Sequence, residues 1–350
     1  MNTFKLSPDL DEFRDEVRKT AERAFADKAA YWDRQEEFPH ENHKILAELG
    51  YLGLLIPDEY GGSGAPLIQG ALMVEELARV DFATALVAQI YLHTVANHIV
   101  VKGTAKQKST YLPQLARGEI MMSISISEAH AGSAVTDLKT SATIDGNDVI
   151  INGSKCYFTA GHVVSHVLVF VRFGKCSGAN GIGAVIVERG TPGFSAGPPH
   201  SKMGARAIGE TDLFFDNCRV PRENVLVMGD PENSEGFKTL MSCFGTERVG
   251  SAAMSVGIAQ GAFEYAKKFT EERHQFGRPI AEFQGLQWKI ADMATQIHAA
   301  RLMTYRAAQN VDQNGIPNSY ETAMAKLYAN EMVQRVTNDA MQICGHFGYT

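Results

Sequence analysis

The sequence lacks any regular arrangement of its few cysteines. The chain has 5 cysteines, and they are scattered with no CxxC pair (Cys156, Cys176, Cys218, Cys243 and Cys344). Such spacing predicts neither a disulfide framework nor a zinc site. Cys344 and His346 lie close together in the sequence, but no second pair of ligands is near them. We therefore expect no metal centre.

Positive charge, long apolar runs and a leader segment are missing as well. The formal net charge is −7 over 350 residues, so we expect no nucleic-acid partner. No stretch reaches the roughly 18 consecutive apolar residues of a membrane span, and we expect none. The N-terminal segment carries acidic residues and no apolar core, unlike a secretory or transit peptide. The expected location is the cytoplasm, or an organelle matrix if a targeting segment was removed.

Common nucleotide and hydrolase motifs are also absent. No GxGxxG stands between a strand and a helix; "GANGIGAV", starting at Gly178, leads into a strand and is better explained as a hairpin loop. The sequence contains no GxxxxGK[ST], GxSxG or HExxH. These general motifs therefore assign no function, and any nucleotide cofactor is not held in a Rossmann or P-loop manner.

The pattern of apolar residues indicates three segments, helical, then extended, then helical. Residues 1–117 show helical spacing, and residues 118–232 contain short β-like runs separated by Gly/Asn turns. "MMSISIS" alternates Ile124 and Ile126 with serines, the pattern of a half-buried strand. We expect a small β-sandwich or barrel here. The fold class is thus α+β, with a helical N-terminal domain, a β middle domain and a C-terminal bundle in 233–350.

Long helices are predicted in the last segment. The apolar pattern indicates one continuous helix over 237–273, a second over 282–315 and a third over 319–345. The first of these contains Glu247 and Arg248 side by side. On the face of Glu247 the neighbours at helical spacing are small or apolar (Gly250, Ser251, Met254, Ile258, Gly261 and Tyr265). Glu247 is therefore expected to point inward, either as a catalytic acid–base group or as a structural partner of Arg248.

Several motifs, in order and at the right spacing, resemble the acyl-CoA dehydrogenase family of flavoproteins. They include "PDEYGGSG", "SEAHAGS", "INGSKCYFTAG", "ERHQFGRPIAEFQ" and "QICGHFGYT", and the resemblance runs from about residue 8 to the last residue. It implies the same α, β, α order of domains, an FAD cofactor, an acyl-CoA substrate, a homotetramer and an electron-transfer flavoprotein as electron acceptor. It also implies oxidation of the Cα–Cβ bond, with a hydride passing from Cβ to flavin N5.

The resemblance further implies roles for particular residues. One group would contact FAD: Ile124, Ser125, Ile126, Ser127, Gly132, Ser133, Tyr157, Phe158, Thr159, Arg273, Gln275, Phe276, Gln284, Gln342, Gly345 and His346. A second group would contact the CoA thioester: Ser133, Gly245, Thr246 and Arg248. Arg273 and Phe276 match residues that reach the FAD of a neighbouring subunit. The family usually has other residues at Ala129, His130, Ala134 and His346, so the flavin loop departs from the common pattern.

The catalytic base has two possible locations in the family. Some members place the catalytic glutamate at the helix position of Glu247, and many others place it beyond the position of Thr350. The resemblance implies about one or two further helices there. Glu247 is our candidate base. Rival functions are an enoyl-CoA reductase, an oxidase, a dehydrogenase of carrier-protein thioesters, and a non-catalytic flavoprotein or scaffold.

Copurification of FAD is the first test of this interpretation. The loop at 127–133 and the "ERHQFG" segment predict that the purified protein is yellow, with the two absorbance bands of an oxidised flavin. Absorbance spectroscopy and analysis of the released cofactor check it. Stoichiometric recovery of a nicotinamide nucleotide without flavin would contradict the prediction.

Overall fold

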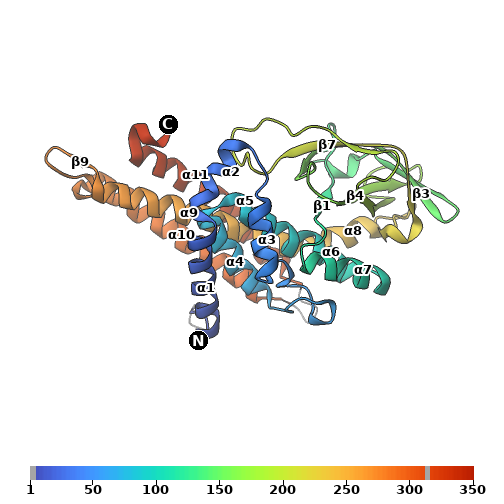
Figure 1. Ribbon diagram of the computed structural model, residues 1–350, viewed down its shortest axis with the longest axis horizontal. Coiled ribbons are helices and arrows are strands. Elements are labelled where there is room, and N and C mark those ends of the chain that lie inside the picture. Colours follow the sequence, from blue (N-terminus) through green and yellow to red (C-terminus); the bar gives the residue numbers. More distant parts are fainter. Residues whose placement is uncertain (1–4, 312–315) are drawn as a thin grey trace. The chain divides into compact units, whose positions relative to one another are not determined.

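The chain is helical up to Ala116, forms strands from Met122 to Val227, and is helical again from Glu235, in the order predicted from the apolar pattern. The computed structural model describes residues 5–311 and 316–350, and their ribbon is drawn in Figure 1. Contacts group the chain into two units. Unit 1 contains residues 1–29, 66–89 and 245–350, and unit 2 contains 30–65 and 90–244. The N-terminal helices are thus divided between the two units.

Unit 1 is helical apart from one small hairpin. Its main elements are α1 (Pro8–Ala24), α4 (Leu67–Val80), α5 (Phe82–Gln89), α9 (Phe244–Glu272), β9 (His274–Gln275), β10 (Arg278–Pro279), α10 (Gln284–Gln309) and α11 (Ser319–Cys344), with short 3-10 turns η6 (Ile280–Glu282) and η7 (Gly345–Gly348). In Figure 1 the β9 hairpin lies at the far end of α9 and α10, which it connects. Caps mark helix starts: the Ser7 side chain accepts the Leu10 N–H, and Asn318 accepts from Tyr320 and Glu321.

The core of unit 1 contains small and medium apolar residues from four helices. Leu72 of α4, Val256 of α9, Ile297 of α10 and Met332 of α11 belong to one buried cluster. The two glycines of α9 at Gly257 and Gly261 let its backbone approach α4 closely. A Cβ placed on Gly257 would stand 2.1 Å from a carbonyl oxygen of α4, and one on Gly261 would stand 2.2 Å from another. The α9–α4 contact therefore requires glycine at both positions.

Predicted helix boundaries in this region are partly confirmed and partly wrong. The predicted helix over 319–345 matches α11, and that over 282–315 matches α10 for as far as it is described; its predicted end, at residues 312–315, lies outside the described residues. The single helix over 237–273 is wrong. It is interrupted at Cys243, where α8 (Glu235–Ser242) ends and α9 begins. The apolar pattern continues through this break, so it gave no signal of the interruption.

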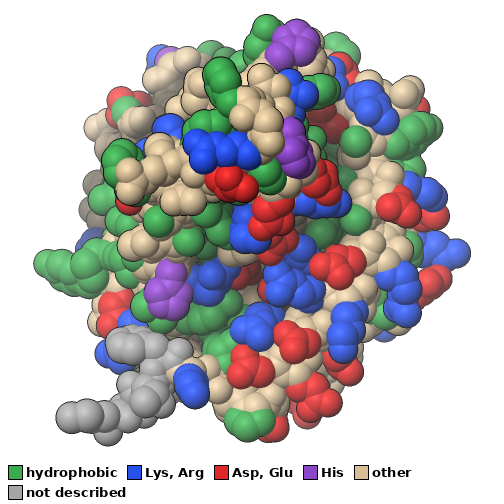
Figure 2. Space-filling model, turned by 90° about the vertical axis from the view of Figure 1, so that its left-hand side faces the viewer, with side chains coloured by type: hydrophobic (Ala, Val, Ile, Leu, Met, Phe, Trp, Pro, Cys, Tyr) green, Lys and Arg blue, Asp and Glu red, His purple; other side chains and the backbone are tan. Residues whose placement is uncertain are grey.

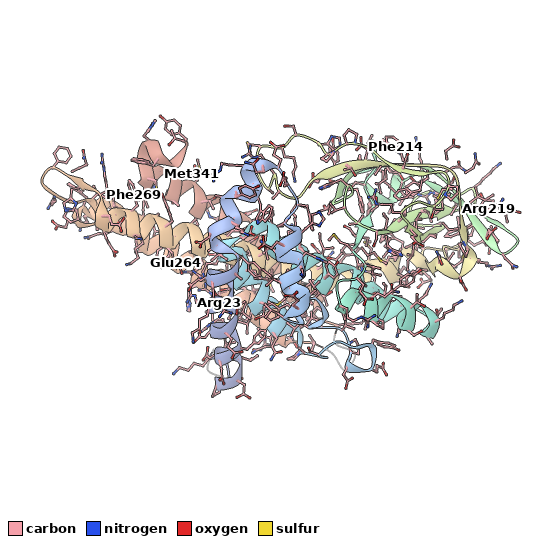
Figure 3. The ribbon with its side chains drawn as sticks, in the orientation of Figure 1. Arg23, Phe214, Arg219, Glu264, Phe269 and Met341 are labelled. Atoms are coloured by element: carbon pink, nitrogen blue, oxygen red, sulfur yellow. The ribbon has the colours of Figure 1, made fainter. Side chains whose placement is uncertain are left out.

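Ion pairs join α1, α4, α9 and α10 around the buried side chains of Arg79, Glu76 and Glu75. Arg79 of α4 donates to Glu22, Glu76 and Glu264 at 2.5, 3.1 and 2.9 Å. Glu264, labelled in Figure 3, also accepts from Arg18 of α1 at 3.1 Å. A separate pair joins Arg301 to Glu75, whose oxygen lies 2.7 Å from the guanidinium. Charges at this depth require such partners, because an isolated buried ion is costly.

Unit 2 combines short helices with the strands of the chain's middle segment. Its helical elements are α2 (Ala26–Gln35), which begins in unit 1, α3 (His40–Glu48), η1 (Tyr51–Gly53), η2 (Asp58–Tyr60), the π-helix η3 (Ile90–Val95), α6 (Ala96–Lys102), α7 (Ala105–Ala116), η4 (Val135–Asp137), η5 (Arg222–Asn224) and α8. Its strands are β1 (Met122–Ser125), β2 (Ser141–Asp145), β3 (Asp148–Thr159), β4 (His166–Phe173), β5 (Ile182–Glu188), β6 (Phe194–Ala196), β7 (Glu210–Pro221) and β8 (Val225–Val227).

The strands of the middle segment pair into one mixed, hydrogen-bonded sheet, so the predicted β segment between helical segments is confirmed. Their order is β6-β7-β3-β2-β4-β5-β8, so β6 and β8 are its edges, and β1 pairs with β4 outside this path. Strands β1 and β2 both run parallel to β4 and occupy successive parts of its side. The other pairs are antiparallel. The turn residues predicted short strands in this segment, whereas the order in which the strands pair depends on contacts between residues far apart in the sequence.

The isoleucines and serines that alternate in and after β1 are not divided between core and solvent as predicted. Ser123 and Ser125 are the buried residues, at 3% and 2% exposure, whereas Ile124 and Ile126 are half-buried. Both faces of this strand are therefore covered. Pattern alone assigned the isoleucines to the core, because it could not show that the serine face also lies against protein.

One helical stretch is apolar enough to resemble a membrane span. Residues 82–102, comprising α5, η3 and α6, meet the length and hydropathy required, but 72% of the apolar window is buried inside the protein. Most of this stretch is therefore core of the protein. The π-helix within it was not predicted; such segments widen a helix locally and are common near functional sites.

Replacing Gly257 by alanine tests the α9–α4 contact. We expect Gly257→Ala to destabilise the protein by about 1–3 kcal/mol, because the added methyl group would overlap a carbonyl oxygen. Thermal unfolding would measure it. Gly285→Ala is the matched control: a Cβ there meets nothing within 4 Å, so it should be neutral or stabilising by up to roughly 1 kcal/mol. Equal unfolding temperatures for Gly257→Ala and wild type would contradict the close contact.

Candidate functional site

Glu247 lies in the first turn of α9 and is half-buried. Burial raises the pKa of its carboxyl, and this effect outweighs the opposing influence of Arg248, Lys326 and a hydrogen bond from Gln89. Within the described residues, Glu247 forms no ion pair. A partly dehydrated carboxylate without an ion-pair partner is the state expected of a general base.

Arg248 does not neutralise Glu247, although the two are adjacent in sequence. Successive side chains on a helix point about 100° apart, and no ion pair joins these two among the described residues. Gln89, the last residue of α5, lies beside Glu247 and is 4% exposed. Its amide nitrogen lies 3.5 Å from the backbone oxygen of Glu247. The structural alternative of a Glu247–Arg248 pair thus has no support in the geometry.

The predicted CoA-contacting residues beside Glu247 are partly buried. Gly245 and Thr246 are buried, and Arg248 is half-buried. A Cβ on Gly245 would meet Pro317 at 3.0 Å, so this turn of α9 is tightly packed. The fourth residue predicted to contact the substrate, Ser133, lies in unit 2 and is exposed.

The β9 hairpin carries three predicted FAD residues and exposes all of them. Arg273, Gln275 and Phe276 are exposed, and the Phe276 ring has 94% of its surface accessible. Phe276 and Gly277 both have positive φ, +54° and +79°, as in the tight turns that connect hairpin strands. For phenylalanine this conformation is strained. Within the described part of the chain, the Arg273 guanidinium has no hydrogen bond or ion pair.

The remaining C-terminal FAD candidates lie at the same end of unit 1. The rings of Phe269, one turn before the hairpin, and Phe347 of η7 are 5.9 Å apart; Figure 3 labels Phe269 on α9 and Met341 on α11. Gln342, Gly345, His346 and Gln284 are all exposed, and the His346 ring contacts the hydroxyl of Tyr349 at 2.9 Å. The structure therefore gathers these sequence-distant candidates near one end of the bundle.

Charges on the surface are mixed rather than segregated by sign. On the face shown in Figure 2, acidic and basic side chains alternate, with hydrophobic groups between them. This agrees with the small net charge of −7. On this face, within the described residues, the basic side chains do not gather into a broad area that would attract a polyanion.

In unit 2 the loop after β1 is fastened to β3, and this brings two predicted flavin segments together. The Cys156 N–H donates to the Ser127 carbonyl at 3.0 Å. Glu128 and Ala131 exchange backbone hydrogen bonds at 3.1 and 2.9 Å, closing a tight turn. Residues 124–133 and 157–159, predicted to cover the flavin from two sides, therefore lie in one region of unit 2.

A buried ion pair lies directly beneath this loop. Lys155 Nζ is 2.8 Å from Glu128 Oε1 and donates to the Ile126 carbonyl at 2.9 Å. The two side chains are 0% and 4% exposed. Glu128 also accepts the backbone N–H groups of Lys139 and Thr140 at 2.7 and 3.0 Å. Burial by itself would raise the pKa of Glu128, but Lys155 and these donors outweigh it and hold that pKa below its usual value.

His130, the unusual residue in the loop, lies beside the same carboxylate. Its Nε2 atom is 3.6 Å from Glu128 Oε2, and its side chain is 44% exposed. When protonated, His130 forms a second ion pair with Glu128. The residue that departs from the common family pattern, His130, thus has Glu128 as a neighbouring partner.

The 157–159 segment has an irregular backbone. A β-bulge separates Lys155 from Phe158 in the pairing with β7, and Tyr157 has φ +54° with 67% exposure. Phe158 is buried in the core at 2% exposure, so only its backbone is available to a ligand. Thr159 is half-buried. Strain in an exposed aromatic residue next to a bulge is typical of a functional surface.

Unpaired polar groups in this region fit a large polar ligand. Ser125 Oγ is buried and has no hydrogen-bond partner among the described residues. The Ser127 N–H likewise has no acceptor within the described chain, although Ser127 is half-buried. Buried polar groups normally find partners. The hydroxyl and amide donors here match the acceptor atoms of a flavin ring, so these residues fit FAD.

Sequence reasoning missed several residues that shape the site. Lys155 and Glu128 were not candidates, nor was Gln89. Arg172 was also missed; its guanidinium donates to the carbonyls of Thr136 and Leu138 at 2.6 and 3.2 Å. One signal was present for Lys155. It shares strand parity with buried Val149 and Ile151, and a lysine on the core side of a strand needs a buried carboxylate partner.

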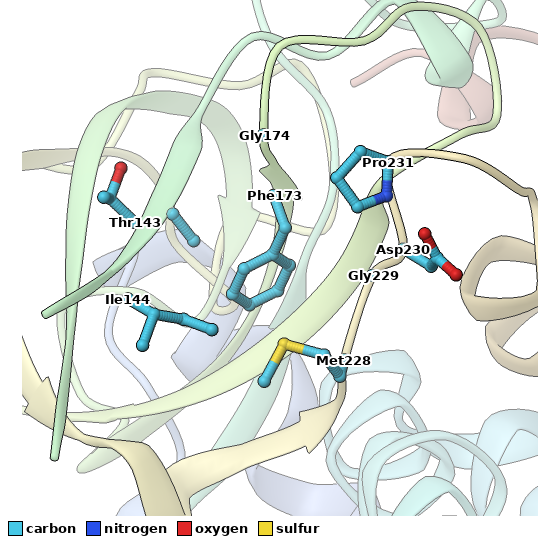
Figure 4. Close-up of a pocket in the computed structure, with 9 residues that line it drawn as sticks. Thr143, Ile144, Phe173, Gly174, Met228, Gly229, Asp230 and Pro231 are labelled. Carbon is cyan, nitrogen blue, oxygen red and sulfur yellow. The ribbon is translucent and has the colours of Figure 1, made fainter. Parts of the chain in front are cut away.

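A separate hollow in unit 2 lies outside the candidate residues. It has a volume of about 540 Å³ and is bordered by β2, β4 and the segment after β8 (Ala142, Thr143, Ile144, Phe173, Gly174, Met228, Gly229, Asp230 and Pro231). Figure 4 shows Phe173 between Ile144 and Met228. Its one titratable group, Asp230, already accepts from Glu232 and Asn233. None of the predicted catalytic or cofactor residues lines this hollow.

Family models cover nearly the whole chain. Residues 7–119 match the acyl-CoA dehydrogenase N-terminal domain, residues 123–218 the middle domain and residues 234–350 the C-terminal domain of the same family. The matches follow one another in the order of the sequence prediction, helical, then β, then helical.

Relatives and solved structures point to the same family. The chain is 39% identical to an acryloyl-CoA reductase (NADH) from Anaerotignum propionicum, over 99% of this chain and 87% of the relative. Butyryl-CoA dehydrogenase from Megasphaera elsdenii has a TM-score of 0.93 and 34% identity, over 100% and 91% of the two chains. A structure described under the electron transferring flavoprotein of Acidaminococcus fermentans contains a chain with TM-score 0.94 and 37% identity, over 99% and 90%.

Proposed function

This chain belongs to the acyl-CoA dehydrogenase family, and from this premise we propose that Glu247 is the base that removes the α-proton of its acyl-CoA substrate. Like its family, the protein is an FAD-dependent oxidoreductase that dehydrogenates an acyl-CoA thioester between Cα and Cβ. The observation that supports Glu247 is its environment: it is half-buried, it lacks an ion-pair partner within the described chain, and its pKa is raised.

The chemistry requires a carboxylate of this kind. The α-proton of a thioester is weakly acidic, so its removal needs a base whose pKa has moved toward the working pH. Burial moves the pKa of Glu247 in that direction, while Arg248, Lys326 and a hydrogen bond from Gln89 oppose the shift without cancelling it. FAD, when bound, supplies the hydride acceptor. The protein contributes orientation, water exclusion and the proton acceptor.

FAD and substrate contacts are proposed for the residues described above. In unit 2, the loop from Ile124 to Ser133 and the 157–159 segment would meet the flavin ring and ribityl chain. In unit 1, the β9 hairpin and η7 would meet the dinucleotide part. Gly245, Thr246, Arg248 and Ser133 would contact the CoA thioester. The domain limits 1–117, 118–232 and 233–350 remain part of this proposal.

The physiological direction has two candidates. Oxidation with electrons passing to an electron-transfer flavoprotein is the first, supported by the similarity to butyryl-CoA dehydrogenase and to a structure described under such a flavoprotein. The second is reduction of an enoyl-CoA, supported by the relative named as an acryloyl-CoA reductase. Anaerobic stopped-flow assays in both directions distinguish them. Rapid reaction of the reduced flavin with oxygen would instead favour an oxidase, and activity on carrier-protein thioesters alone would replace the CoA substrate.

We propose a homotetramer located in the cytoplasm. The support for assembly is the exposed apolar surface of unit 1, where Trp288, Tyr320 and Leu327 are 62%, 80% and 62% accessible along with Phe276. Exposed aromatic residues in such number on helices are typical of an interface between subunits.

Replacing Glu247 by glutamine tests the assignment of the base. Glu247→Gln keeps shape and hydrogen bonding but cannot accept a proton, so flavin reduction by a good acyl-CoA should slow by about a hundredfold to ten-thousandfold. FAD content should stay normal, and an enoyl-CoA product should still perturb the flavin spectrum. Glu271→Gln, an exposed carboxylate on the same helix, is the control. A near wild-type rate in Glu247→Gln would make Glu247 structural.

Removing the Arg273 side chain tests the hairpin. Arg273→Ala should lose FAD and weaken assembly, because an exposed and unpaired guanidinium offers charge-assisted hydrogen bonds that a methyl group cannot replace. Flavin absorbance per chain and light scattering measure the two effects. The control is Arg219→Ala, which removes an exposed arginine from unit 2. Unchanged FAD occupancy in Arg273→Ala, or a monomer that holds FAD, would contradict the proposal.

A further inference from the structure

The buried ion pair of Lys155 and Glu128 also binds the backbone of the loop after β1. Both side chains are almost fully buried, and every hydrogen bond they make to backbone goes to the loop after β1 or to the segment that follows it. Lys155 binds the Ile126 carbonyl, and Glu128 binds the N–H groups of Lys139 and Thr140. The pair therefore fixes the beginning and the end of the loop that contains Gly132 and Ser133.

The orientation of one peptide group follows from these contacts. In a trans peptide the carbonyl of one residue and the N–H of the next point in opposite directions. Because Lys155 draws the Ile126 carbonyl toward itself, the Ser127 N–H points away from the ion pair. That N–H has no acceptor among the described residues. The Ser127 carbonyl belongs to the next peptide group, and it accepts the Cys156 N–H. The peptide groups on both sides of the Ser127 Cα are therefore each held by a hydrogen bond.

A second buried cation makes the arrangement more rigid. Arg172, 8% exposed, binds the carbonyls of Thr136 and Leu138 inside the same loop. It also binds the carbonyls of Gly178 and Asn180 at 3.0 and 2.5 Å. Lys155, Glu128 and Arg172 together carry one net positive charge beneath the loop. Reduction adds negative charge to a flavin, so a positive charge nearby favours the reduced form.

We propose that Lys155, held by Glu128, is a positioning residue that presents the Ser127 N–H to a hydrogen-bond acceptor of the flavin ring. The inference rests on the proposed FAD contacts of residues 124–133. Glu128 keeps Lys155 charged and in place, and Lys155 sets the Ile126–Ser127 peptide. The cluster thereby influences both the affinity for FAD and the reduction potential of the bound flavin.

The variants are chosen to separate positioning from folding. Lys155→Met removes the charge and the donor but leaves Glu128 buried without its partner, which alone is destabilising. The double variant Lys155→Met/Glu128→Gln removes both charges, so no lone buried ion remains. Lys106→Met is the matched control, because it removes a lysine from an exposed ion pair with Glu223 in the same unit.

The expected results concern bound and unbound FAD separately. In the double variant, the FAD dissociation constant measured on the apoprotein should rise about tenfold, the worth of one hydrogen bond. In Lys155→Met, the reduction potential of the bound flavin should fall by about 30 mV, which corresponds to a tenfold change for two electrons. The control should change neither quantity. A purely structural pair would lower the unfolding temperature without moving the potential.

A measurement on the wild-type protein keeps the proposal open to refutation if the variants fail to fold. Hydrogen–deuterium exchange at the Ser127 amide should slow strongly when FAD is added to the apoprotein. Equal exchange with and without FAD, or wild-type FAD affinity and flavin potential in the folded double variant, would overturn the proposal. Failure of the wild-type protein to bind FAD would instead refute the proposed cofactor contacts, so the two failures are distinguishable.

Discussion

A carboxylate removed from water must find donors or give up its charge, and this constraint organises both units of the protein. In unit 2 Glu128 receives three donors, from Lys155 and two backbone amides, and stays ionised with a lowered pKa. In unit 1 Glu247 has no ion pair within the described residues, and burial raises its pKa. The same chemical group therefore becomes a structural anchor in one place and a candidate base in the other.

Close packing of two helix backbones in unit 1 sets the position of Glu247. Gly257 and Gly261 bring α9 against α4 at a distance that no side chain tolerates, and this fixes the axial and rotational position of α9. In the first turn of α9, Glu247 then lies half-buried near the end of α5. Arg79 of α4 is fully engaged, because it forms ion pairs with Glu22, Glu76 and Glu264. Along α9, Glu264 is thus held in ion pairs, whereas Glu247 in the first turn has none within the described residues.

The sequence was sufficient for the helices and the order of domains, because helical periodicity and turn residues are local signals. It was insufficient wherever the answer depended on a neighbour distant in the chain. The break at Cys243 and the burial of Ser123 and Ser125 are of this kind, as is the pairing order of the strands. For the site, family resemblance supplied Glu247 and the flavin loop, whereas Lys155 required knowledge of the Glu128 side chain facing it. Its strand parity was visible, but a partner could not be named from parity alone.

Backbone strain occurs at residues assigned to FAD on independent grounds. Tyr157 and Phe276 are among the six non-glycine residues with positive φ in the described chain, and each such residue costs on the order of 1–3 kcal/mol. Each is held by neighbouring hydrogen bonds: Cys156 N–H to the Ser127 carbonyl, and Ile280 N–H to the Arg273 carbonyl at 2.8 Å. Both side chains are nonetheless exposed. Within the chain each ring meets one other ring, Tyr157 with His200 at 5.8 Å and Phe276 with Phe283 at 6.0 Å between centroids. Because most of each side chain stays exposed, the strained conformation is best explained by what that residue contacts when the cofactor and neighbouring subunits are present.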